Sequence, residues 1–188
     1  INLDKPRKIS MLRLVRYSEP ILKPVPYHWW ESRYVFNPGV IYHNGLVHML
    51  YRAMGEDGIS RLGYAVSADG LNFYRLDLPV LSPDLPEEVK GIEDPRITWL
   101  EDKFYVLFTA YSGSEIRISM ASTTNFITWT RHGILLPNED NKDAALFPEK
   151  INGRYVMLHR RPPDIWIAYS EDLIHWTDHK IIMRPRPG

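Results

Sequence analysis

The chain has 188 residues, no cysteine, and equal numbers of basic and acidic side chains, 23 Lys+Arg against 23 Asp+Glu. The balanced charge argues against nucleic acid as a partner, the lack of thiols excludes disulfides and thiolate metal sites, and the apolar runs are too short to cross a membrane. We therefore expect a cytoplasmic protein that uses no metal or cofactor and binds neither nucleic acid nor membranes.

Residues 1–36 are expected to form an extended lead-in that packs on the domain formed by residues 37–188. Pro20, Pro24 and Pro26 fix φ and remove amide donors, which disfavours a helix in this part. The whole chain holds 15 prolines and 11 glycines, so turns are frequent. Its 6 Trp, 11 Tyr and 6 Phe favour strands.

Three consecutive units then repeat one pattern, over residues 37–90, 91–141 and 142–188. In each unit a proline-containing strand is followed by two apolar strands, and the prolines stand at Pro38, Pro95 and Pro148. Four-stranded antiparallel units of roughly 50 residues in tandem are typical of β-propeller blades. The pattern predicts an all-β fold with about three four-stranded blades.

Each unit contains two kinds of turn. A polar turn separates the first two strands, at Asn44-Gly45, Glu101-Asp102 and Asn152-Gly153. After the third strand come a hydroxyl residue, an Asx two positions later and an aromatic six positions later: Ser67, Asp69 and Phe73; Thr123, Asn125 and Trp129; Ser170, Asp172 and Trp176. Because Ser, Thr and Asx side chains bond nearby amides, we interpret this second pattern as structural.

The first strand of each blade lines the central channel of a propeller, so its polar residues are site candidates. Asn37, Asp94 and the pair Lys142-Asp143 stand at equivalent positions. Asp94 lies beside Glu93 and close to Arg96, an environment that can tune a carboxyl group to donate a proton near neutrality. The alternative is that Asp94-Pro95 only begins a strand.

A group of cations is predicted at the same end of the channel. Arg52 and Arg160 end the second strands of the first and third units, and Lys142 begins the third unit. Such a group suits an anion such as phosphate, which arginine holds with two parallel hydrogen bonds. The alternative is ordinary ion pairing, for instance of Arg52 with Glu56 or Asp57.

On these residues the chain resembles glycoside hydrolase family 130, the β-mannoside phosphorylases and related mannosidases. The resemblance rests on Asn37-Pro38-Gly39, Tyr51-Arg52-Ala53, Glu93-Asp94-Pro95-Arg96, the run from Lys142 to Glu149, and His159-Arg160. It implies a five-bladed propeller, of which this chain would hold three blades. We therefore expect either a piece of a longer protein or copies that associate as a homo-oligomer to close the ring.

The resemblance also implies an inverting phosphorolysis, with inorganic phosphate as co-substrate and α-mannose 1-phosphate as product. Asp94 would protonate the glycosidic oxygen through a sugar hydroxyl. Asn37 and Arg52 would hold the sugar, Lys142 and Arg160 would hold phosphate, and Arg96 and Asp143 would be neighbouring substrate contacts. Phosphate is itself the nucleophile, so no second carboxylate has to activate water.

The expected substrates are β-1,4-mannosides, either mannooligosaccharides or mannosyl-N-acetylglucosamine. One alternative is a β-mannoside hydrolase of the same family, although Lys142 and Arg160 favour phosphate. Another is a non-catalytic carbohydrate-binding propeller. Five-bladed glycosidases that use two or three carboxylates are disfavoured, because Asn37 stands where such enzymes place an acid.

Overall fold

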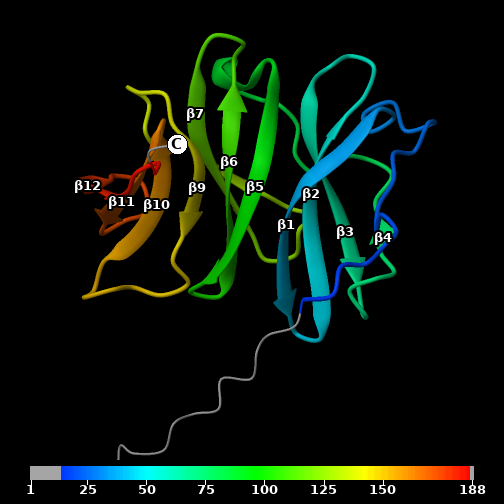
Figure 1. Cartoon of the computed structure of the whole chain (residues 1–188), viewed down its shortest axis with the longest axis horizontal. Coiled ribbons are helices and arrows are strands. Elements are labelled where there is room, and N and C mark those ends of the chain that lie inside the picture. Colours follow the sequence, from blue (N-terminus) through cyan, green and yellow to red (C-terminus); the bar gives the residue numbers. More distant parts are fainter. Residues whose placement is uncertain (1–13, 187–188) are drawn as a thin grey trace, which may run out of the picture.

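The computed structural model describes residues 14–186 and consists of three four-stranded antiparallel blades side by side (Figure 1). The all-β propeller architecture predicted from the repeats is therefore confirmed. The strands are β1 (Tyr34–His43), β2 (Leu46–Met54), β3 (Ser60–Ser67), β4 (Tyr74–Arg75), β5 (Gly91–Leu100), β6 (Lys103–Tyr111), β7 (Ile116–Thr123), β8 (Thr130–Ile134), β9 (Lys142–Leu146), β10 (Tyr155–Arg161), β11 (Asp164–Ser170) and β12 (Thr177–Met183).

Helical structure in the described residues is limited to one short 3-10 turn, η1 (Pro86–Glu88), so no helix there is long enough to cross a membrane. Each blade is a simple meander in which neighbouring strands pair antiparallel. A single parallel pair, Ser60 with Gly91, joins the first blade to the second. The third blade, β9 to β12, is a separate sheet.

The lead-in is attached to the first blade through a buried carboxylate. Glu31 is fully buried and accepts hydrogen bonds from the Tyr51 hydroxyl (2.9 Å) and the Arg75 guanidinium (2.9 Å). Its neighbour Trp30 is also fully buried and donates its indole N–H to the Asp77 carbonyl at 2.8 Å. Residues 14–33 of the lead-in contain no strand, and β1 begins at Tyr34, so the last three residues of the expected lead-in belong to the first blade.

The hairpin turns have the left-handed backbone that the sequence pattern indicates. The central pairs have positive φ in all three blades: 49° and 84° at Asn44-Gly45, 49° and 60° at Glu101-Asp102, and 51° and 80° at Asn152-Gly153. This geometry matches the twist of the flanking strands. The second blade achieves it without a glycine.

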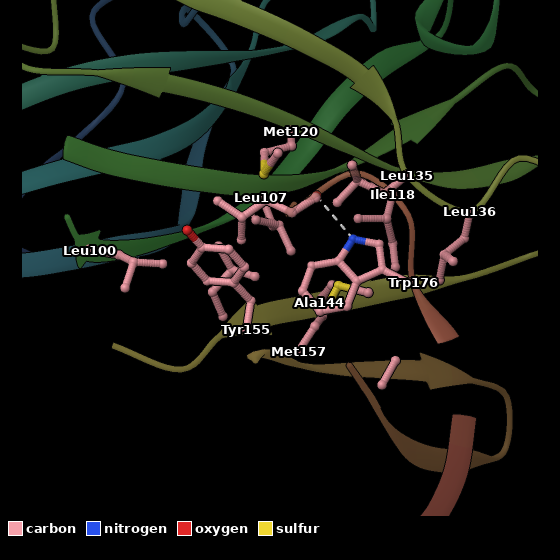
Figure 2. Packing of buried hydrophobic residues seen from close by; sticks show 13 residues of the cluster. Leu100, Leu107, Ile118, Met120, Leu135, Leu136, Ala144, Tyr155, Met157 and Trp176 are labelled. Atoms are coloured by element: carbon pink, nitrogen blue, oxygen red, sulfur yellow. Dashed lines mark hydrogen bonds between the residues drawn. The ribbon is translucent and has the colours of Figure 1, made fainter. Parts of the chain in front are cut away.

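Hydrophobic clusters between the blades hold the sheets together. Figure 2 shows the cluster between the second and third blades, where Trp176 lies against Leu107 and Ile118 of the second blade. Its indole N–H donates to the Leu173 carbonyl at 3.0 Å. A second cluster, with Leu50, Leu62, Ile92, Val106 and Phe126 among its members, joins the first two blades. Burying each such side chain contributes about 1.5–3 kcal/mol.

The pattern of hydroxyl, Asx and aromatic residues is structural, as predicted. Ser67 Oγ accepts from the amides of Asp69 (3.2 Å) and Gly70 (2.9 Å), and Asp69 Oδ1 accepts from the next two amides along the chain. Thr123 with Asn125, and Ser170 with Asp172, repeat these bonds in the other blades. Asp172 also bonds the His175 side chain at 2.7 Å, and this bond, followed by those from the backbone amides, holds the pKa of Asp172 well below its usual range.

Candidate functional site

A left-handed residue interrupts the innermost strand of each blade at the same place. Asn37 has φ 44°, Asp94 has φ 54° and Asp143 has φ 55°. Each stands where the strand pairing slips, a β-bulge in β1, β5 and β9. Asn and Asp tolerate this conformation better than most residues, but it still strains the backbone. Its recurrence in three blades singles out these positions.

The first two bulges bring their side chains together. Asn37 Nδ2 donates to Asp94 Oδ1 at 2.9 Å, which joins the first blade to the second at this point. Arg52 lies on the strand next to Asn37, and its Nη1 is 3.4 Å from the same Asp94 oxygen. The side chains of Arg52 and Asp94 are each 15% exposed, so both are largely buried, whereas Asn37 is exposed.

Arg52 is held from several directions. Its Nε donates to Ser60 Oγ at 2.8 Å, its Nη2 to Glu93 Oε1 at 2.6 Å, and its guanidinium lies 4.6 Å from the centre of the Phe36 ring. The ion pairs with Glu56 or Asp57, considered as alternatives from the sequence, do not form; those carboxylates pair with Arg33 and Arg61. Arg52 therefore belongs to the site.

Glu93 is a site residue that the sequence analysis did not select. Its side chain is 18% exposed and forms the shortest ion pair of the group, with Arg52. Burial raises the pKa of the Glu93 carboxyl, and the Asp94 carboxylate adds to this, whereas Arg52 and Lys142 pull the pKa down. Its adjacency to Asp94 is the only mark of Glu93 in the sequence, and this adjacency does not indicate which way the side chain points.

The third bulge carries a second cluster. Asp143 Oδ2 lies 2.7 Å from Arg160 Nη2, and its Oδ1 lies 3.5 Å from Arg96 Nη2 of the second blade. Arg160 stands opposite Lys142 in the pairing of β9 and β10. Among the residues that the structure describes, the buried Nε of Arg160 has no hydrogen-bond partner.

The seven candidate residues thus fall into two neighbouring groups. Asn37, Arg52 and Asp94 form one around the first two bulges, and Arg96, Asp143 and Arg160 form the other around the third. Lys142 lies between them, since it is the first residue of β9, next to the third bulge, and its charge acts on Glu93. The arrangement combines a carboxyl group held by an amide with several cations, a combination suited to a proton donor beside an anion.

Comparison with known proteins gives consistent matches. The model of glycoside hydrolase family 130, described as beta-1,4-mannooligosaccharide phosphorylase, matches residues 8–188. A 1,2-beta-oligomannan phosphorylase from Thermoanaerobacter sp. (strain X514) is 50% identical over 189 residues, covering 95% of this chain and 64% of that protein. A Beta-1,4-mannooligosaccharide phosphorylase from Ruminococcus albus is 35% identical over 100 residues, covering 49% of this chain and 29% of that protein.

A solved structure extends the comparison to the fold. Beta-1,2-mannobiose phosphorylase from Listeria innocua, in its beta-1,2-mannobiose complex, superposes with a TM-score of 0.75 at 29% identity. The superposition covers 82% of this chain and 60% of that one. The chain therefore spans less than two thirds of the length of the relatives it matches.

Proposed function

Because the chain belongs to glycoside hydrolase family 130, we propose that it carries part of the active site of a β-mannoside phosphorylase. The reaction is the inverting attack of inorganic phosphate on a β-mannoside, with α-mannose 1-phosphate as product. It takes place in the cytoplasm and uses phosphate as co-substrate, with no other cofactor.

The observation that carries this proposal is the unequal pairing of the three carboxylates at the site. Glu93 and Asp143 each form a short ion pair with an arginine, at 2.6 and 2.7 Å. Asp94 lies 3.4 Å from its arginine and accepts a neutral hydrogen bond from Asn37. Asp94 is thus the carboxyl group best placed to carry a proton, as a reaction with one acid requires.

The other residues take roles by their chemistry. Asn37 orients the acid and, with Arg52, borders the sugar. Lys142 and Arg160 receive the phosphate, since they stand opposite each other on β9 and β10 and bring two positive charges together. Asp143 holds Arg160 and Arg96 in place. A hydrolase has no need for this set of cations, which is why phosphorolysis is preferred over hydrolysis.

The linkage of the substrate is proposed from the relatives. The sequence resemblance favours β-1,4-mannosides, as does the description of the matching family. The relative with 50% identity is named for β-1,2-oligomannan, and the superposed structure holds β-1,2-mannobiose. We therefore place β-1,2-mannosides first and β-1,4-mannosides second.

The test is to incubate the protein with β-1,2- and β-1,4-mannobiose, each with and without phosphate, and to measure mannose 1-phosphate. We expect product only with phosphate, and a loss of at least about a hundredfold in Asp94→Asn, because general acid catalysis contributes 10²–10⁴-fold. Free mannose released equally without phosphate would identify a hydrolase. Disaccharide that binds but does not react, both with this chain and with a protein of the relatives' full length that contains it, would identify a carbohydrate-binding propeller.

A further inference from the structure

The proposed proton donor lies next to a permanent positive charge. A guanidinium within about 4–6 Å of a carboxyl group favours its ionised form. A general acid has to hold its proton until the transition state. Arg52 beside Asp94 therefore opposes the role proposed for Asp94, unless another group takes up the charge of the arginine.

Glu93 is placed to do so. The Arg52 guanidinium is 2.6 Å from Glu93 Oε1 but 3.4 Å from Asp94 Oδ1. Consecutive strand residues normally point to opposite faces. Here the left-handed bulge at Asp94 lets both carboxylates reach the same arginine.

A second anchor fixes the arginine from the far side. Ser60 is fully buried and accepts the Arg52 Nε–H at 2.8 Å. Ser60 is in turn fixed by Gly91, where an added Cβ would lie 2.8 Å from the Ser60 Cβ. With the Phe36 ring beneath it, the guanidinium is held where its Nη1 makes only a long bond of 3.4 Å to Asp94 and has little freedom to come closer.

We propose that Glu93 is a positioning residue that pairs with Arg52 and holds its charge away from Asp94, with Ser60 as the second anchor. This inference rests on the function proposed above. The charged groups that face Glu93 are Arg52 from β2, Asp94 on its own strand and Lys142 from β9. Glu93 thereby joins the first blade to the second through its ion pair with Arg52, while the charge of Lys142 acts on it from the third.

The direct test is a ¹³C-carboxyl NMR titration of Asp94 in the chain, assigned with Asp94→Asn. Glu93→Gln frees the guanidinium to pair with Asp94, so the titration midpoint of Asp94 should fall by about one pH unit. The matched control is Glu56→Gln, which breaks an Arg–Glu pair of 2.7 Å on the exposed surface and should leave the midpoint unchanged. An unchanged midpoint in Glu93→Gln would overturn the proposal.

A double-mutant cycle shows whether Glu93 acts through Arg52. In an Arg52→Gln background the effect of Glu93→Gln should shrink to less than half, because the charge it neutralises is gone. An equal shift in both backgrounds would mean simple repulsion between two acids and would reject the positioning role. Ser60→Ala removes no charge and should shift the titration midpoint of Asp94 in the same direction by a smaller amount. It replaces Glu93→Gln as the test variant if Glu93→Gln does not fold.

The NMR titrations need no enzymatic turnover, so their outcome does not depend on whether the proposed function is correct. Where phosphorolysis is measurable, the alkaline limb of the pH profile of kcat/KM should move to lower pH in Glu93→Gln by the same shift as the titration. A chain that binds but never turns over mannoside would defeat the proposed function and leave the titration result intact.

Discussion

At the residue scale, backbone conformation selects the site. Asn37, Asp94 and Asp143 each hold a left-handed conformation inside a strand, which costs about 1–3 kcal/mol per residue in the absence of compensation. The compensation is visible at each one as a polar bond across a blade boundary or to a neighbouring strand. Strained residues at equivalent places in successive blades mark the region where the polar side chains of the three blades come together.

Arg160 yields a prediction at this scale. Replacing it by Gln removes a charged donor from the proposed phosphate contact, and charged hydrogen bonds contribute about 1.5–3 kcal/mol. The KM for phosphate should therefore rise roughly 10- to 100-fold, while the affinity for mannobiose changes little. Arg154→Gln is the matched control, since it breaks a 2.6 Å pair with Asp178 on the exposed part of the same blade. A rise in both constants would show that Arg160 contacts the sugar instead.

Several site residues could be selected from the sequence, and Glu93 could not. Asn37, Asp94 and Asp143 stand at repeat-equivalent positions, so the alignment of the units identifies them. Glu93 precedes Asp94 directly, and the alternation of a regular strand predicts that it points away. Only the bulge, which no residue type specifies by itself, turns both acids toward Arg52.

At the element scale, local hydrogen bonds determine where each blade turns. The Ser/Thr and Asx pairs bond the same succession of amides in all three blades, so this pattern could be predicted in full from spacing. The loop ahead of β5 could not. Its buried Glu88 accepts from Arg131 of β8 at 2.9 Å, a pairing between residues far apart in the sequence with no local signal.

The glycine-free turn of the second blade gives a prediction about stability. Asp102 has φ 60°, a conformation that an L-residue adopts at a cost of roughly 1 kcal/mol and glycine adopts freely. Asp102→Gly should raise the free energy of unfolding by up to about this amount in urea denaturation. Glu101→Asn should lower it, because Glu101 accepts from the Tyr155 hydroxyl (2.7 Å) and pairs with Lys150 (3.1 Å) across the blade boundary. A loss of stability in Asp102→Gly would mean that the turn is not strained.

At the scale of the whole molecule, the blades are joined by apolar clusters and by a few buried polar groups between them. The repeat period predicts the blades and their order, because each sheet must cover its faces with neighbours. It does not predict which polar groups enter the boundary. Asn141 is an example: its amide donates to the Ile116 carbonyl of the second blade at 3.1 Å, and its side chain reaches His159 of the third.

His159 begins a directional chain of hydrogen bonds in the third blade. The His179 Nε2–H donates to the Trp176 carbonyl (3.2 Å), so His179 Nδ1 accepts from His159 Nε2 (3.0 Å). His159 Nδ1 then accepts from the Asn141 side-chain amide at 2.9 Å. This assignment follows from the hydrogen-bond pattern and requires both imidazoles to be neutral. His159 itself is 1% exposed.

The pH dependence of folding follows from that burial. Burial lowers the pKa of His159 from 6.5 to about 3, and the neighbouring His179 and Arg161 add to the effect. Below pH 6.5 the unfolded chain binds a proton that the folded chain does not, so the free energy of unfolding should fall as the pH drops toward 3, by up to about 1.4 kcal/mol per pH unit. Burial also lowers the pKa of His48 and His132, which act in the same direction.

The variant His159→Gln separates the contribution of His159 to the pH dependence of stability from those of His48 and His132. The variant keeps a donor toward His179 but has no titrating group, so it should be less stable than the native chain at pH 7 and should lose less stability between pH 6.5 and 5. Urea denaturation at closely spaced pH values measures the two slopes, and the comparison cancels the carboxylates, which are the same in both proteins. Equal slopes in the native chain and His159→Gln would show that the boundary between the blades admits a charged imidazole, and that the chain from Asn141 to Trp176 rearranges to hold it.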